Sequence, residues 1–224
     1  MNLKAIDTII LDLDGTLVDT APDLTSALNH VLASAGREAV ALEEVRHMVG
    51  FGARAMIFKG LDHTGGRLPE VQIEFLHRRF LDYYKHNICA HSLPYPGAVA
   101  ILEAFKAAGK ALGICTNKPT ALAEQLLEEL GLDDYFGAVV GGDAVTASKP
   151  DPEHLAAVID SLEGRRKTSL FIGDSEVDLL AGQALGVPVF LMTHGYSQHS
   201  LNGLGADLLL DNFNELLEWV TLNS

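Results

Sequence analysis

The sequence predicts an α/β fold: a Rossmann-like, doubly wound, mostly parallel sheet with helices on both faces and a small helical domain inserted after the first strand. Three observations predict it. A buried, isoleucine-rich segment at residues 5–11 is typical of a strand. Apolar residues at helical spacing then run through residues 22–85, with no strong strand signal between them. Strands and helices alternate from residue 98 onward.

Two helices of the inserted domain can be justified residue by residue. Pro22 favours a helix start, because proline at the first helical position loses no hydrogen bond, and Gly36 favours its end. Apolar residues recur at every third or fourth position, first as Leu24, Leu28, Val31 and Leu32 and later as Ile73, Leu76, Phe80 and Tyr83. We therefore expect a helical domain at residues 20–85 and a core domain at residues 1–19 and 86–224.

The core elements follow the turn residues Pro94-Tyr95-Pro96-Gly97. Their expected order is a helix at 98–105, a strand at 111–115, a helix at 119–130, a strand at 138–140, a helix from 152, a strand at 169–172, a helix at 176–185, strands at 187–191 and 207–210, and a helix through Trp219. Asp151 before Pro152 predicts a capped helix start, and Gly186 predicts a helix end.

Composition excludes several classes of protein. Hydrophobic residues make up 48% and charged residues 21% of the 224 residues, which is ordinary for a globular chain and argues against disorder. Two cysteines exclude a disulfide framework. The net charge of −14 makes nucleic acid and anionic membranes unfavourable partners. No apolar run approaches a membrane span, and the first residues lack a secretory signal, so we expect a cytoplasmic protein.

The charge is unevenly distributed along the chain. Residues 20–85 hold eight basic and eight acidic side chains, whereas the rest holds eight basic and twenty-two acidic ones. This distribution fits a lid that meets an anionic ligand, and it also fits chance surface composition.

Four polar clusters fall where core strands are expected to end, which is the edge where open α/β sheets bind ligands. They are Asp12–Thr16, Thr116–Lys118, Ser148–Pro150 and Gly173–Asp178. Oxygen ligands from Asp12, Asp14 and Asp174 suit Mg²⁺ together with substrate phosphate oxygens. Thr116 and the helix start that follows it can receive phosphate oxygens, and Lys149 can pair with Asp12 and neutralise phosphoryl charge. Each feature alone is common in turns and on surfaces; the combination indicates one site.

The four clusters resemble the motifs of the haloacid dehalogenase superfamily. The resemblance rests on the segment Asp12-Leu13-Asp14-Gly15-Thr16-Leu17-Val18-Asp19-Thr20, on Thr116-Asn117, on Lys149-Pro150 and on Gly173-Asp174-Ser175-Glu176-Val177-Asp178, in that order along the chain. The helical insertion resembles the cap of the phosphoglycolate phosphatase-like branch. Val49-Gly50-Phe51-Gly52 and Arg54 resemble the loop of that cap that faces the active site, although Phe51 replaces a residue that is often small and polar.

The resemblance implies a role for each matching residue. Asp12 would be the nucleophile, and Asp14 the general acid and then base. Lys149 would hold Asp12 and balance charge. Phosphate would be bound by Thr116, by the Asn117 N–H and by Thr16, and Thr16 would also position Asp14. Mg²⁺ would be bound by Asp12, by the backbone carbonyl of Asp14 and by Asp174. Asp178 would support the metal. The excess of cations in the cap further suggests that Arg54 contacts an anionic part of the substrate.

The function implied is a Mg²⁺-dependent phosphatase of a small phosphate ester, first of all 2-phosphoglycolate, in carbohydrate metabolism, acting as a monomer or homodimer. Alternatives of the same superfamily are a phosphosugar phosphatase acting, for example, on N-acetylmuramate 6-phosphate, a pyrophosphatase and a sugar phosphomutase. A phospho-aspartate receiver domain is much shorter than this chain and takes its phosphate on a mid-chain strand. A binding protein without activity is disfavoured, because no motif residue is missing.

Overall fold

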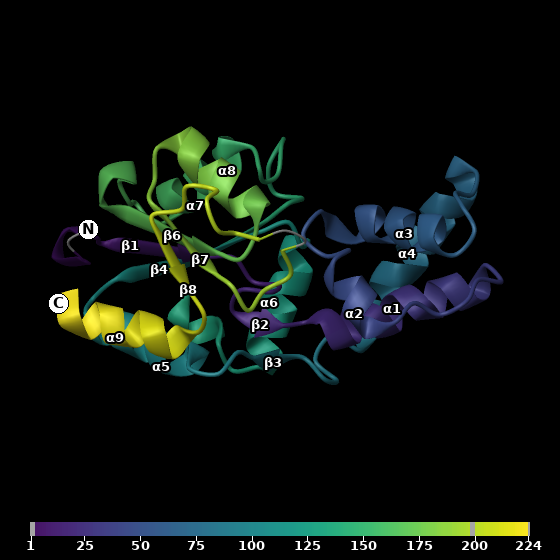
Figure 1. The fold of residues 1–224 in the computed structure, drawn as a ribbon, viewed down its shortest axis with the longest axis horizontal. Coiled ribbons are helices and arrows are strands. Elements are labelled where there is room, and N and C mark those ends of the chain that lie inside the picture. The colour runs from purple at the N-terminus through teal and green to yellow at the C-terminus, as the bar shows by residue number, and fades with distance from the viewer. Residues whose placement is uncertain (1–2, 198–199, 224) are drawn as a thin grey trace. The chain divides into compact units, whose positions relative to one another are not determined.

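The computed structural model describes residues 3–197 and 200–223. Within these residues, parallel strands form one six-stranded sheet in the order β5-β4-β1-β6-β7-β8 (Figure 1). In chain order the strands are β1 (Thr8–Leu11), β4 (Ala111–Thr116), β5 (Ala138–Gly141), β6 (Ser169–Gly173), β7 (Val189–Met192) and β8 (Leu208–Leu210). The predicted doubly wound α/β core is thus confirmed.

Strand β1 lies in the middle of the sheet, and all four of its residues are buried, as expected for a parallel sheet covered on both faces. It begins at Thr8, later than expected, because its neighbours start opposite that residue, at Ala111 and Ser169. Residues Leu3–Ala5 form the 3₁₀ helix η1 instead.

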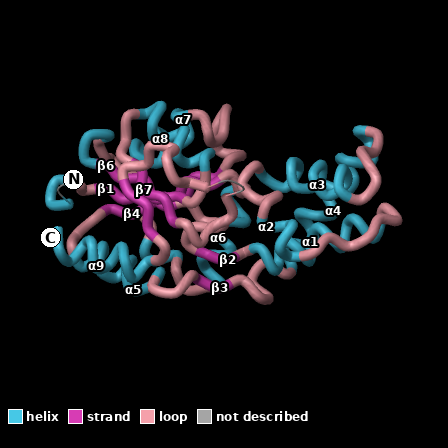
Figure 2. The backbone as a smooth tube through the Cα atoms, viewed as in Figure 1, coloured by secondary structure: helices cyan, strands magenta, loops and turns pink. Residues whose placement is uncertain are grey.

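Helices cover both faces of the sheet. Figure 1 shows α7 and α8 on one side and α5 and α9 on the other, and each pair is in contact. The helices and 3₁₀ turns of this part are α5 (Ala98–Ala107), α6 (Thr120–Glu129), η2 (Asp133–Tyr135), α7 (Pro152–Ser161), η3 (Arg166–Thr168), α8 (Glu176–Leu185) and α9 (Phe213–Asn223). The alternation of strand and helix along the chain is visible in Figure 2.

Strand β7 begins two residues after the expected position. Gly186 adopts the left-handed conformation at the end of α8, with φ of +73°, and the N–H of Val187 donates to the carbonyl of Gly182 over 2.9 Å. Val187 therefore completes the helix end and cannot pair as a strand residue.

The chain divides into two compact units, residues Met1–Asp19 with Pro94–Ser224, and residues Thr20–Leu93. The second unit is built from the helices α1 (Ala21–Ser34), α2 (Leu42–Arg46), α3 (Gly52–His63) and α4 (Glu70–His86). Helices α1 and α3 both pack against α4. The apolar residues expected on α1 are buried, and so are Ile73, Leu76 and Phe80 of α4, but Tyr84 rather than Tyr83 completes the buried face of α4. Among the described residues, no helix combines the length and the apolar character needed to cross a membrane.

The second unit ends at Leu93, beyond the expected boundary at residue 85, because Asp23 holds the returning chain. The buried carboxylate of Asp23 accepts hydrogen bonds from the N–H groups of His91 and Ser92, at 2.9 and 2.8 Å, and from the Ser92 hydroxyl at 2.7 Å. Two further strands, β2 (Val18–Asp19) and β3 (Leu93–Pro94), pair with each other. With two residues each, they are too short to show a period in the sequence.

Candidate active site

The loop after β1 brings Asp12 to the carboxyl edge of the sheet. Its N–H donates to the carbonyl of Ile172 in β6 over 2.9 Å, so Asp12 lies beside the end of that strand. The chain then turns at Gly15, whose φ is +88°. A Cβ at this position would lie 2.7 Å from the ring of Tyr196, closer than side chains approach one another. The turn that carries the acids therefore requires glycine.

Lys149 bridges two of the acids. Its Nζ lies 2.9 Å from Oδ1 of Asp12 and 2.7 Å from Oδ1 of Asp178, and its side chain is only 2% exposed. Burial alone disfavours the charged ammonium, but the two carboxylates outweigh this effect and raise the pKa of Lys149 above its ordinary value. Lys149 is therefore a permanent positive charge beside Asp12.

His154 fixes the loop that carries Lys149. The N–H of Lys149 donates to Nδ1 of His154 over 3.2 Å, and Nε2 of the same ring lies 3.0 Å from the carbonyl of Val140. Because Nδ1 accepts, Nε2 carries the proton and donates, so the ring is neutral. Burial lowers the pKa of His154, in agreement with a neutral ring. Sequence reasoning did not single out His154. The available signal was the capped helix start at Asp151, because it places His154 in the first turn of α7, next to the loop that carries Lys149.

Asp178 is held by the start of α8, where Ser175 is the N-cap residue. Its Oδ2 accepts hydrogen bonds from the Ser175 N–H at 3.1 Å, the Ser175 hydroxyl at 2.6 Å and the Asp174 N–H at 3.3 Å. Its other oxygen contacts Lys149. Asp178 therefore positions Lys149 and the start of the helix, with both carboxylate oxygens engaged.

Asp174, the residue directly after β6, is oriented by two hydrogen-bond donors. The hydroxyl of Thr16 donates to Oδ1 over 2.8 Å, and the backbone N–H of Tyr196 donates to Oδ2 over 2.7 Å. A Cβ at Gly195 would lie 2.2 Å from Cβ of Asp174, so the chain can approach this closely only as glycine. Sequence reasoning missed Gly195 and Tyr196, because the segment after β7 carries no acid or cation that would mark it.

The acids carry more negative charge than Lys149 neutralises. Carboxylate oxygens of Asp12, Asp174 and Asp178 all lie within 4.8 Å of one another. Burial, reinforced by the charges of Asp178 and Asp14 and opposed by Lys149, raises the pKa of Asp12 to about 7. Burial and the charges of Asp178 and Asp12 likewise raise the pKa of Asp174 well above its ordinary value. A buried set of oxygen ligands with excess negative charge fits Mg²⁺.

The carboxylate of Asp14 points to a different partner. Nζ of Lys118 lies 2.8 Å from its Oδ1 and 3.1 Å from its Oδ2. The side chain of Asp14 is 13% exposed, and that of Lys118 is 3% exposed. Sequence reasoning placed Lys118 in the Thr116–Lys118 cluster but gave it no role. A cation directly after a core strand in an acidic chain was the available signal.

Thr116 and Asn117 lie at the end of β4, next to β1 in the sheet. Thr116 is buried, and its hydroxyl accepts a hydrogen bond from the N–H of Lys118 over 3.2 Å. The side-chain amide of Asn117 donates to the carbonyl of Lys149 over 3.0 Å, which ties this loop to the lysine loop. A role of both residues in holding phosphate stays a prediction.

Arg54 lies on α3 in the second unit. Its guanidinium pairs with Glu70 and, over 3.1 Å, with Glu74, both on α4, and lies over the ring of Phe58. A contact between Arg54 and a substrate stays a prediction, and it would require the guanidinium to exchange or share these partners.

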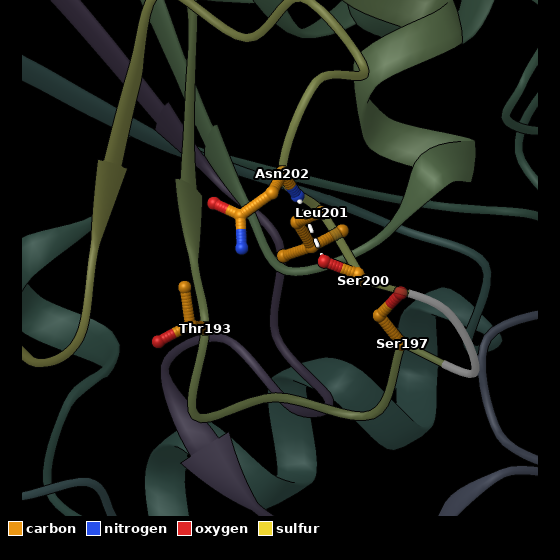
Figure 3. A pocket seen from close by; sticks show the side chains of 5 residues that line it. All are labelled: Thr193, Ser197, Ser200, Leu201 and Asn202. Atoms are coloured by element: carbon orange, nitrogen blue, oxygen red, sulfur yellow. Dashed lines mark hydrogen bonds between the residues drawn. The ribbon is translucent and has the colours of Figure 1, made fainter.

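A cavity of about 180 Å³ lies in the segment after β7 (Figure 3). The described residues that line it are uncharged: Thr193, Ser197, Ser200, Leu201 and Asn202. These five described side chains therefore offer no counter-charge to an anionic substrate.

Comparison with known proteins connects this geometry to a family. Residues 9–192 match the haloacid dehalogenase-like hydrolase family. The phosphoglycolate phosphatases of Caulobacter vibrioides and Agrobacterium fabrum are 43% and 42% identical to this chain; each match covers 92% of this chain and 87% and 89% of the relative, respectively. A solved structure described as a predicted phosphoglycolate phosphatase from Haemophilus somnus is similar with a TM-score of 0.91 and 30% identity, over 96% of this chain and 98% of that one.

The match spans most of the chain and includes all four loops that meet at the carboxyl edge of the sheet. The chain belongs to the haloacid dehalogenase-like hydrolase family and is a phosphoric monoester hydrolase of its phosphoglycolate phosphatase-like branch.

Proposed function

We propose that this enzyme is a Mg²⁺-dependent phosphatase that converts 2-phosphoglycolate to glycolate and phosphate through an aspartyl-phosphate intermediate. One observation carries the proposal: the buried carboxylate of Asp12 pairs with Lys149 and lies within 4.8 Å of the carboxylates of Asp174 and Asp178, in a cluster whose negative charge exceeds what one lysine neutralises. This is an arrangement for bringing a carboxylate nucleophile to a metal-bound phosphate ester.

In the proposed first step, Asp12 attacks phosphorus, the bond from phosphorus to the ester oxygen breaks, and Asp14 gives its proton to the departing alkoxide. In the second step, water attacks the aspartyl-phosphate, Asp14 takes a proton from that water, and Asp12 leaves as a carboxylate. Splitting hydrolysis in this way replaces one difficult step by two easier ones. Lys149 holds Asp12 and balances charge throughout.

The metal would be held by the carboxylates of Asp12 and Asp174 and by the backbone carbonyl of Asp14. When bound, Mg²⁺ neutralises phosphate charge so that an anionic nucleophile can approach. Asp178, whose oxygens contact Lys149 and the α8 start, would support the site without binding the ion directly.

Phosphate oxygens would be bound by the Thr116 hydroxyl and the Asn117 N–H. Thr16, whose hydroxyl donates to Asp174, would also help to bind phosphate and to position Asp14. Arg54 would contact an anionic part of the substrate from the cap. A cytoplasmic location, a monomeric or homodimeric state and a place in carbohydrate metabolism are further predictions.

The choice of substrate is supported by relatives that bear the name phosphoglycolate phosphatase at 36–43% identity. The experiment is to measure phosphate release from 2-phosphoglycolate, hexose phosphates, N-acetylmuramate 6-phosphate and pyrophosphate, each with and without Mg²⁺. We expect strong, Mg²⁺-dependent release from 2-phosphoglycolate.

Preferential release from a phosphosugar or from pyrophosphate would contradict the substrate but keep the catalytic assignments. Isomerisation of a phosphosugar without net phosphate release would instead indicate a phosphomutase. Equal rates with and without Mg²⁺ would contradict the metal assignment.

A further inference from the structure

Lys118 is a second buried lysine of the acid-rich site, and the chemistry proposed above does not use it. Its side chain is 3% exposed, and its Nζ contacts both carboxylate oxygens of Asp14, at 2.8 and 3.1 Å. Burying an ammonium is unfavourable unless an anion compensates it. Asp14 supplies that anion here, and the question is what a buried cation contributes beside a proposed acid–base group.

The position of Lys118 relative to the reaction follows from its partner. Asp14 is proposed to protonate the ester oxygen of the leaving group, so a cation that contacts Asp14 also lies beside the leaving group. Lys149 stands at the nucleophile instead, where it contacts Asp12 and Asp178. The two buried lysines thus divide the site into a side for the transferred phosphoryl group and a side for the leaving group.

A negative charge on the leaving group would affect how strongly the substrate binds beside Asp14. Asp12, Asp14, Asp174 and Asp178 would repel a substrate carboxylate that entered beside Asp14, and Lys149 is engaged on the other side. A lysine ammonium is a compact charge on a flexible stem, which can share or exchange a carboxylate partner. The attraction between the Lys118 ammonium and a substrate carboxylate would be stronger in this buried position than at the surface, because water screens it less.

We propose that Lys118 binds a carboxylate carried on the carbon next to the ester oxygen of the substrate, and that it thereby selects α-phosphoryloxy acids over neutral phosphate esters. This inference rests on the proposed phosphatase function and assigns a residue to its substrate class. In 2-phosphoglycolate the carboxylate is attached to the carbon that bears the ester oxygen, so one ligand places that oxygen at Asp14 and its carboxylate at Lys118.

The test compares two esters that differ in one group, 2-phosphoglycolate and 2-hydroxyethyl phosphate, in the wild-type enzyme and in Lys118→Met. We expect the wild type to prefer the carboxylate ester. In Lys118→Met, kcat/KM for 2-phosphoglycolate should fall about 30-fold more than kcat/KM for 2-hydroxyethyl phosphate, as expected for the loss of one charged hydrogen bond.

Two further variants make the result interpretable. Lys118→Gln keeps hydrogen-bond donors for Asp14 without the charge, so it should show the same change of preference even if Lys118→Met folds poorly. Lys106→Met removes an exposed lysine of α5 whose ammonium donates to the carbonyl of Asp134 and lies over the ring of Tyr135, and it should leave the preference unchanged. Inhibition by glycolate should also weaken in both Lys118 variants.

Equal losses on both esters would overturn the inference, because Lys118 would then act only by positioning Asp14. Unchanged kinetics in both variants would overturn it as well. A wild-type enzyme that hydrolyses 2-hydroxyethyl phosphate as well as 2-phosphoglycolate would contradict carboxylate selection while leaving the phosphatase function intact. Release of phosphate from neither ester by the wild type would instead contradict the proposed function, and this inference with it.

Discussion

The backbone N–H of Tyr196 donates to Oδ2 of Asp174 over 2.7 Å, although 22 residues separate the two along the chain. A backbone donor cannot rotate away as a side chain can, so this bond sets the direction in which Asp174 points. The other carboxylate oxygen, Oδ1, accepts a hydrogen bond from the Thr16 hydroxyl. The segment after β7 therefore orients an acid of the active site while contributing no acid itself.

Gly195→Ala should disturb this arrangement. The new Cβ would lie 2.2 Å from Cβ of Asp174, so the backbone must move. We expect kcat to fall tenfold or more and the free energy of unfolding to fall by about 2 kcal/mol, measured by phosphate release and by urea denaturation. Gly203→Ala is the control: its φ of +82° makes alanine strained, but nothing lies within 4 Å. It should cost about 1 kcal/mol and leave kcat unchanged. Normal activity in Gly195→Ala would show that the orientation of Asp174 does not depend on this contact.

Asp12→Asn should abolish turnover while the protein stays folded. The amide has nearly the same size as the carboxylate, but it is not a nucleophile toward phosphorus. We expect phosphate release to drop at least about a thousand-fold, with an unchanged circular dichroism spectrum. Residual activity close to that of the wild type would contradict the covalent mechanism.

Mg²⁺ should stabilise the protein through Asp12 and Asp174. At a tenfold excess over its Kd, the ion should add about 1.4 kcal/mol, a rise in Tm of roughly 3–5 °C. Asp174→Asn should lose this rise. Asp14→Asn should keep it, because the side chain of Asp14 contacts Lys118 and only its backbone carbonyl is proposed as a ligand. Thermal melting with EDTA or with Mg²⁺ measures the difference; an equal rise in the wild type and Asp174→Asn would exclude Asp174 as a ligand.

Asp23→Asn should destabilise the protein in a pH-dependent way. Burial would raise the pKa of Asp23, but hydrogen bonds from His91 and Ser92 outweigh it and lower the pKa below 3.8. The carboxylate therefore contributes stability above pH 3.8, and this contribution is lost as the pH falls further. We expect the variant to lose about 2–3 kcal/mol at pH 7 and less at pH 3, measured by urea denaturation. Asp82→Asn, at an exposed position on α4, is the control and should change stability little at either pH. The same loss at both pH values would show that the charge of Asp23 is not what stabilises the fold.

Much of the fold could be predicted because apolar periodicity is local. Residues 176–185 form α8 as expected, since Ser175 can cap its start and Gly186 can end it. Strand limits were less predictable, because they depend on neighbours: β1 starts at Thr8 only because Ala111 and Ser169 stand opposite it. The extent of the second unit likewise depends on Asp23 reaching Ser92, a contact across 69 residues.

The sequence by itself determined which chemistry is present: acids, hydroxyls and a lysine follow strands that run in parallel, so they must meet at one edge of the sheet. Only the tertiary structure decided how they are paired. Asp178 shares Lys149 with Asp12, whereas Asp14 turns to Lys118, a partner 104 residues away. Such pairs depend on side-chain direction and on how deeply each loop is buried. Both arise from packing between distant segments, which local spacing does not encode.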